Sequence, residues 1–290
     1  MAKVAIVTDS VASIPESFLR ELNIHWVAYY IHRGKEVLRD LVTVQREEFL
    51  EWLGTARVLP TTASPGPGDY LSMYEQLIEE QGVDEIVSIH ITSKGSGAYQ
   101  AAQVARSMLK ERLPQLKLEV IDTLNVSLCQ GWMAIEAARA ALAGKSFTEV
   151  VARVKRMIPI THMLQTADTL KYLYLGGRIG LAKKLAGSLL NIKPLIGIRD
   201  GVVFPLGQAR SRIRVYQLMV ELIESTVGVG SRIKVAYVHA GALPEVLKIK
   251  EAVEARLQVV ESFIAELSPA LAVHTGPGTA GLCYYPVLDQ

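Results

Sequence analysis

Four short stretches of the chain combine hydroxyls, glycines and a cation in patterns that suit the binding of an anion. In TTASPGPGDY (residues 61–70), Pro65 and Pro67 restrict the loop and hold the hydroxyl of Thr62 in place. The glycines between and after these prolines let a ligand approach the backbone. The same stretch also suits a loop that caps the next helix through its hydroxyls.

The second stretch, ITSKGSGAYQ (91–100), follows a predicted strand and leads into a predicted helix. Ser93 and Ser96 supply hydroxyls and Gly95 opens the backbone, at a helix N-terminus that favours an anion. Ser96 would equally serve as an ordinary N-cap. Only Lys94 adds positive charge nearby, so these donors fit one carboxylate better than a polyphosphate.

The other two stretches add a guanidinium and a titratable ring. YLGGRIG (174–180) places Arg178 after two glycines, which suits recognition of a carboxylate but also a solvated turn. HTGPGTAG (274–281) combines His274 and Thr275 with glycine and proline. A histidine in this setting either contacts a carboxylate or is buried as a structural side chain.

The motifs of several enzyme classes are missing. The sequence has no Walker A loop, no HExxH and no GxSxG, and its six histidines lack metal-ligand spacing. A formal net charge of +2 without a dense basic tract argues against a nucleic-acid partner. No apolar run reaches the about 18 residues of an integral membrane segment. Cys129 and Cys283 lack CxxC spacing, which predicts buried thiols in a reducing, cytoplasmic compartment.

The elements that must position these residues alternate between strands and helices over the first half. Apolar, β-branched runs such as KVAIVTDS (3–10) and DEIVSIHI (84–91) are typical of buried parallel strands. Polar residues follow such strands at the sheet edge where open α/β folds bind ligands. These residues are Asp9, Ser10, Thr92, Ser93, Asp122 and Thr123.

The pattern changes near Ser146, which forms a predicted capping box with Glu149. Beyond this point hairpin-like strands mix with helices. The sequence therefore predicts an α/β protein with an N-terminal, Rossmann-like parallel-sheet domain over residues 1–150. A C-terminal α+β domain with a mixed or antiparallel sheet is predicted over residues 151–290.

Taken in order, these motifs resemble those of the DegV family of fatty-acid-binding proteins. The matching stretches are VTDSVASIP, TASPGPGDY, TSKGSGAYQAA, VIDT, LKYLYLGGRIG, NIKPLIG and HTGPG, which together extend over essentially the whole chain. The resemblance implies a two-domain α/β carrier that holds one long-chain fatty acid in a tunnel between its domains, with no other cofactor.

The resemblance also implies roles for single residues. The hydroxyls of Thr62 and Ser93 would hold the acid's carboxylate, with His274 near the head group. Supporting positions are Gly95, Ser96 and Thr275. Arg178 matches an arginine implicated in presenting the acyl carboxylate to the ATP-binding subunit of a fatty acid kinase, which makes acyl phosphate for phospholipid synthesis. Departures from the family pattern, such as Ala63, leave the chain-length preference open.

Two enzymatic alternatives stay open at this point. The fold family is related to dihydroxyacetone kinase, so a phosphotransfer protein would use His90 or His274 to contact its substrate. The missing nucleotide motif weighs against use of ATP by this chain alone. A serine hydrolase would instead pair Ser93 or Ser96 with His274.

Overall fold

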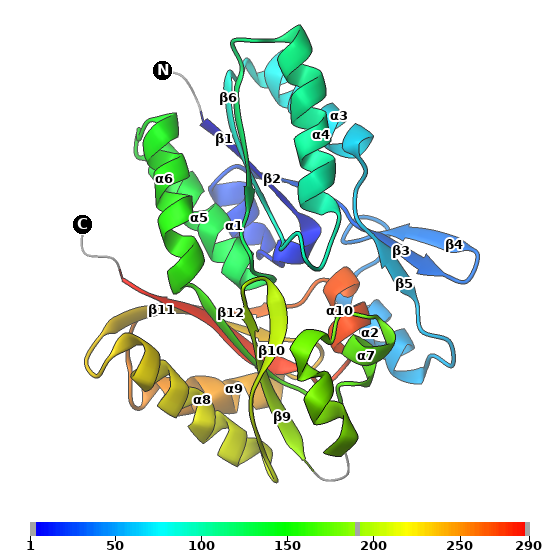
Figure 1. Cartoon of the computed structure of the whole chain (residues 1–290), viewed down its shortest axis with the longest axis vertical. Coiled ribbons are helices and arrows are strands. Elements are labelled where there is room, and N and C mark those ends of the chain that lie inside the picture. The colour runs from blue at the N-terminus through cyan, green and yellow to red at the C-terminus, as the bar shows by residue number, and fades with distance from the viewer. Residues whose placement is uncertain (1–3, 189–191, 288–290) are drawn as a thin grey trace.

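The computed structural model describes residues 4–188 and 192–287. Figure 1 shows two β-sheets with their helices stacked along the long axis of the molecule, and a smaller third sheet at one side. The sheets have four, six and three strands. The predicted fold class, a parallel N-terminal sheet followed by a mixed C-terminal sheet, is confirmed.

The N-terminal sheet is parallel, with the strand order β2-β1-β6-β7. Every residue of β6 is buried, including its polar Glu85, Ser88 and His90, as is typical of a strand covered on both faces. One helix pair, α3 and α4, lies on one side of this sheet, and α5 and α6 lie on the other (Figure 1). The strands are β1 (Val4–Asp9), β2 (Ile24–Val27), β6 (Glu85–His90) and β7 (Lys117–Asp122), and the helices are α1 (Glu16–Glu21), α3 (Pro67–Gln81), α4 (Ala98–Arg112), α5 (Leu128–Leu142) and α6 (Phe147–Met157).

The small sheet holds the first of the four candidate stretches. Strand β3 (Tyr30–Arg33) pairs with β4 (Glu36–Arg39) and with β5 (Thr61–Ala63), both antiparallel. The stretch 61–70, predicted as a turn throughout, therefore begins with an edge strand, in keeping with the β-propensity of its two threonines. Helix α2 (Arg46–Thr55) connects β4 to β5.

The C-terminal sheet has the strand order β10-β9-β8-β13-β11-β12, in which only β11 and β12 are parallel. Helices α8 and α9 cover one face with an apolar core of their own. The other face packs against the N-terminal half, where Trp132 of α5 lies against two aromatic rings of the sheet. The elements are β8 (His162–Thr166), β9 (Lys193–Arg199), β10 (Val202–Ala209), α8 (Arg212–Val227), β11 (Arg232–His239), α9 (Leu243–Glu254), β12 (Gln258–Glu266) and β13 (Ala280–Pro286).

The halves meet around three short helices, α7 (Lys171–Leu175), the 3-10 helix η3 (Gly180–Ser188) and α10 (Pro269–Thr275). Helix α10 packs against α7, α2 and β5, so a C-terminal element sits among N-terminal ones. The capping box at the start of α6 is confirmed, since Ser146 and Glu149 bond each other's backbone amides. The division at 150/151 stays a prediction, and that boundary falls within α6.

Candidate ligand-binding site

A cavity of about 440 Å³ lies between the two halves, a volume typical of small-molecule sites. Aliphatic side chains form much of its wall, which comes from the C-terminal sheet, from β5, from loops after the parallel strands and from the helices between the halves. Representative apolar lining residues are Val11, Ile91, Val126, Leu173, Ile196 and Leu271. An apolar tail therefore has a surface to bind along much of this cavity.

Polar groups from all four candidate stretches meet at the same cavity. Of the predicted site residues, Thr62, Gly95, Ser96, Arg178, His274 and Thr275 all line it, although up to 213 positions separate them in the sequence. Thr62 lies on β5, Ser96 in the loop before α4, and His274 on α10. The fold thus brings together at one cavity four stretches that are far apart in the sequence.

Thr62 is paired with a neutral histidine. Its Oγ1 lies 2.7 Å from Nε2 of His274, and Nδ1 of the ring has no hydrogen-bond partner among the described residues. Burial, followed by the charge of Arg178, lowers the pKa of His274 to about 4, so the ring is uncharged at neutral pH. A ring that carries its proton on Nε2 donates to Thr62, and the Thr62 hydroxyl proton is then available to a ligand.

Ser96 has a similar arrangement with a different donor. The phenol of Tyr29 lies 2.6 Å from Ser96 Oγ. Burial, followed by the nearby charge of Asp9, raises the pKa of Tyr29 well above its usual value, so the ring keeps its proton. Tyr29 can therefore donate to Ser96, which leaves the serine proton for an acceptor in the cavity. No motif pointed to Tyr29, because it lies between two strands and outside all four candidate stretches.

Arg178 lies at the exposed edge of the site and links the two halves. Its Nη1 donates to the carbonyl of Gly176 at 2.7 Å, and its Nε donates across to the carbonyl of Gly95 at 3.5 Å. A β-carbon on Gly176 would collide with the ring of His274, so this position requires glycine. The arrangement places a permanent positive charge beside two hydroxyl donors, which is the chemistry that a carboxylate requires.

Comparison with known proteins gives the wider context of this site. The model of the DegV family, described as an uncharacterised protein family, matches residues 3–287. The chain belongs to the DegV family. A DegV domain-containing protein of Caldanaerobacter subterraneus is 29% identical over 284 residues, covering 98% of this chain and 99% of that one. Protein DegV of Bacillus subtilis is 28% identical over 282 residues, covering 97% and 98%.

Solved structures of DegV proteins match the whole chain. A DegV family protein from Thermus thermophilus, described as binding fatty acid, has a TM-score of 0.91 at 29% identity and covers 98% of this chain and 100% of its own. DegV of Bacillus subtilis, described as a fatty-acid-binding protein, has a TM-score of 0.85 at 27% identity and covers 99% and 100%.

Ser93, expected from the DegV motif to bind the carboxylate, is not among the residues that line the cavity. Ser93 lies within a tight turn, in which the amides of Gly95 and Ser96 both donate to the carbonyl of Thr92. The Ser93 amide instead donates to the carboxylate of Asp122, at 3.2 and 3.3 Å. Within this stretch Thr92 and Ser96 line the cavity, and because the Thr92 hydroxyl donates to the carbonyl of Gly201, Ser96 is the candidate donor to a ligand.

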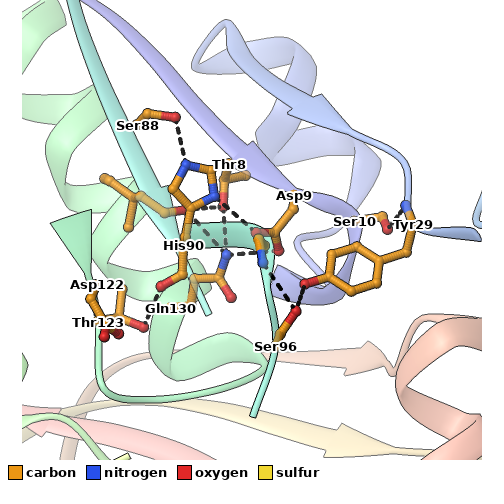
Figure 2. Close-up of polar contacts among 12 residues, drawn as sticks. Thr8, Asp9, Ser10, Tyr29, Ser88, His90, Ser96, Asp122, Thr123 and Gln130 are labelled. Atoms are coloured by element: carbon orange, nitrogen blue, oxygen red, sulfur yellow. Dashed lines mark hydrogen bonds and ion pairs between the residues drawn. The ribbon is translucent and has the colours of Figure 1, made fainter. Parts of the chain in front are cut away.

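The strand-end residue Asp9 belongs to a separate, sealed cluster (Figure 2). His90 Nδ1 lies 3.1 Å from Asp9 Oδ2, His90 Nε2 lies 2.7 Å from Ser88 Oγ, and Gln130 donates to Asp9 Oδ1 at 2.9 Å. This is the order of a Ser-His-Asp triad. However, none of these side chains is more than 1% exposed, and none lines the cavity. The expectation that His90 contacts a substrate is therefore contradicted.

The hydrolase alternative also lacks its geometry at the cavity. His274 is bonded to Thr62 rather than to Ser93 or Ser96, and within residues 4–188 and 192–287 no carboxylate contacts its second nitrogen. The described part of the chain holds no group of three or more metal-ligating side chains and no helix able to cross a membrane. Cys129 and Cys283 are both free and buried.

Proposed function

We propose that this DegV family protein binds a single long-chain fatty acid between its two halves, as a carrier. The observation that carries the proposal is one apolar cavity with two hydroxyls and a guanidinium at the same end. Thr62 and Ser96 donate to the two oxygens of the carboxylate, while Arg178 supplies the opposite charge. His274 and Tyr29 orient these hydroxyls from behind.

The acyl tail contributes more to affinity than the head group does. Burying a methylene is worth about 0.8 kcal/mol, so roughly fourteen of them contribute about 11 kcal/mol before the entropic cost of binding. A hydrogen bond to a charged group contributes about 1.5–3 kcal/mol. The tail therefore holds the acid in the cavity, and Thr62 and Ser96 decide which end faces the mouth.

The exposed position of Arg178 suggests a use for the carboxylate of the bound acid. Together with the DegV motif that contains it, the position of Arg178 supports presentation of the carboxylate to the ATP-binding subunit of a fatty acid kinase, for acyl-phosphate formation. The expected result is that such a subunit forms acyl phosphate from ATP only with the loaded carrier, and that Arg178→Ala slows the reaction while the acid stays bound.

The direct test is native mass spectrometry of the freshly purified protein, followed by solvent extraction and mass analysis of the released molecule. We expect one long-chain fatty acid per chain. A protein that is empty, and that also takes up neither added palmitate nor added oleate, would refute the proposal. Hydrolysis of an activated ester that depends on Thr62 or Ser96 would instead indicate an enzyme.

A further inference from the structure

Among the polar side chains of the cavity wall, Gln165 lies on the C-terminal sheet, away from the four candidate stretches. Gln165 of β8 lines the cavity and is only 4% exposed. No hydrogen bond joins its side-chain amide to any residue that the structure describes. Its neighbours along and across the sheet on the same wall, Met163 and Ile196, are apolar.

The other deeply buried glutamine shows how unusual this is. The amide nitrogen of Gln130 donates to Thr8, to Asp9 and to the carbonyl of Ile89. Buried amides are normally bonded in this way, because an amide that loses water without gaining a partner costs free energy. The amide of Gln165 must therefore find its partner among the contents of the cavity.

The residue of β13 opposite Gln165 offers no side chain as a partner. Gln165 is paired in register with Gly281 of β13. A β-carbon on Gly281 would lie 2.9 Å from the Cα of Gln165, so the close approach of the two strands requires glycine here.

A plain acyl chain is a poor occupant for this part of the cavity. Packed against Gln165, its methylenes would displace water from the amide and offer neither a donor nor an acceptor. A hydroxyl or oxo group on the chain would offer both oxygen lone pairs and, for the hydroxyl, a proton. The amide of glutamine donates and accepts, so it suits either group.

We propose that Gln165 is a second polar contact for the ligand and selects acyl chains that carry an oxygen substituent between the carboxylate and the tail end. This inference rests on the proposed fatty-acid function. Gln165 is buried whereas Arg178 at the mouth is exposed, and the hydroxyls of Thr62 and Ser96 are bonded to His274 and Tyr29 rather than to Gln165. The substituent therefore lies along the chain rather than beside the carboxylate.

The experiment compares octadecanoate with hydroxyoctadecanoates that carry the hydroxyl at successive positions along the chain. Dissociation constants are measured for the wild type, for Gln165→Leu and, as a volume-conserving second variant, for Gln165→Met. We expect the wild type to bind at least one mid-chain isomer about three- to tenfold tighter than octadecanoate. Both variants should reverse this preference. The control, Met163→Leu on the same wall, should change both affinities by the same factor.

The outcomes separate this inference from the proposal beneath it. Equal binding of the plain and hydroxylated acids by the wild type, or a preference that survives in Gln165→Met, overturns the role of Gln165 while fatty-acid binding stands. If the wild type binds none of the acids, the fatty-acid function itself fails and this inference fails with it. Circular dichroism of each variant verifies that the protein tested is folded.

Discussion

Two histidine–hydroxyl pairs among the described residues have the same 2.7 Å separation, one at the cavity and one on β6 of the parallel sheet. Thr62 and His274 line the cavity, and the second nitrogen of His274 has no partner among described residues. Ser88 and His90 are fully buried, and the second nitrogen of His90 faces Asp9.

The two pairs differ in their access to the cavity and in whether the histidine has a ring nitrogen without a hydrogen-bond partner. The cluster of His90 resembles a catalytic triad more closely, yet both ring nitrogens of His90 are paired and its side chain is fully buried. The pair at the cavity is incomplete without a ligand. The distance between two side chains therefore does not decide whether they bind, and each prediction below asks whether the two pairs differ as this comparison requires.

The largest expected effect is a loss of stability when His90 of the buried Ser88–His90 pair is replaced. His90→Ala removes one hydrogen-bond partner each from Asp9 and Ser88, leaves a cavity in a fully buried site, and should lower the free energy of unfolding by about 3–5 kcal/mol. His274→Ala, at the cavity, should cost only about 1 kcal/mol. Urea denaturation of both variants measures the difference. Equal losses would show that the two pairs are not distinct in the way described.

The second-largest expected effect is a loss of fatty-acid affinity when a hydroxyl at the cavity is removed. Ser96→Ala should weaken binding of a long-chain fatty acid by about ten- to a hundredfold, because a hydrogen bond to the charged carboxylate is lost. The matched control is Ser93→Ala, which should bind within about twofold of the wild type because Ser93 does not line the cavity. Isothermal titration with a delipidated protein gives both values. A larger loss in Ser93→Ala would restore the role implied by the DegV motif.

The third effect is a pH dependence that belongs to His274. Its pKa falls from the ordinary 6.5 to about 4 in the folded protein, so between these values the unfolded chain binds the extra proton. Stability is therefore complete above pH 6.5 and is lost as the pH falls toward 4, by about 2 kcal/mol on reaching pH 5.

The measurement must be a difference, because another group titrates in the same window with the opposite sign. Burial raises the pKa of Asp40 to about 6, which makes its contribution grow more favourable as the pH falls. Unfolding free energies of the wild type and of His274→Gln at pH 7 and pH 5 isolate the histidine. An identical loss in both proteins would mean that His274 is not the neutral, buried ring described.

Much of the fold was predictable from the sequence because it depends on local patterns. The buried run of β6 and the capping box of α6 are encoded within a few adjacent residues, and both are confirmed. The candidate stretches were recognisable for the same reason, since each carries its own hydroxyls and glycines. Their convergence on one cavity depends on α10 reaching across to β5, which no local pattern encodes.

The finer features of the site depend on side-chain directions that spacing does not reveal. Ser93 and Ser96 are equivalent as motif residues, and only the turn at Thr92 decides which one faces the cavity. Tyr29 and Gln165 carry no motif at all and acquire their roles from their surroundings. A buried tyrosine or glutamine in a sequence is more often part of a core, so nothing in the sequence separated these two from the rest.

The smallest expected effect tests the donors behind the two hydroxyls. Tyr29 can donate to Ser96 at the cavity, and Tyr74 donates to Ser88 in the sealed cluster at 2.8 Å. Tyr29→Phe should weaken fatty-acid binding about fivefold, because Ser96 would lose the hydrogen bond from Tyr29 that directs its own proton to the ligand. Tyr74→Phe should leave binding unchanged and lower the unfolding free energy by about 1 kcal/mol.

The two variants remove the same atom from tyrosines that are both buried, so they differ only in which hydroxyl loses its donor. If both changed stability and neither changed binding, Ser96 would be held for structural reasons, and the carboxylate would be left to Thr62 and Arg178.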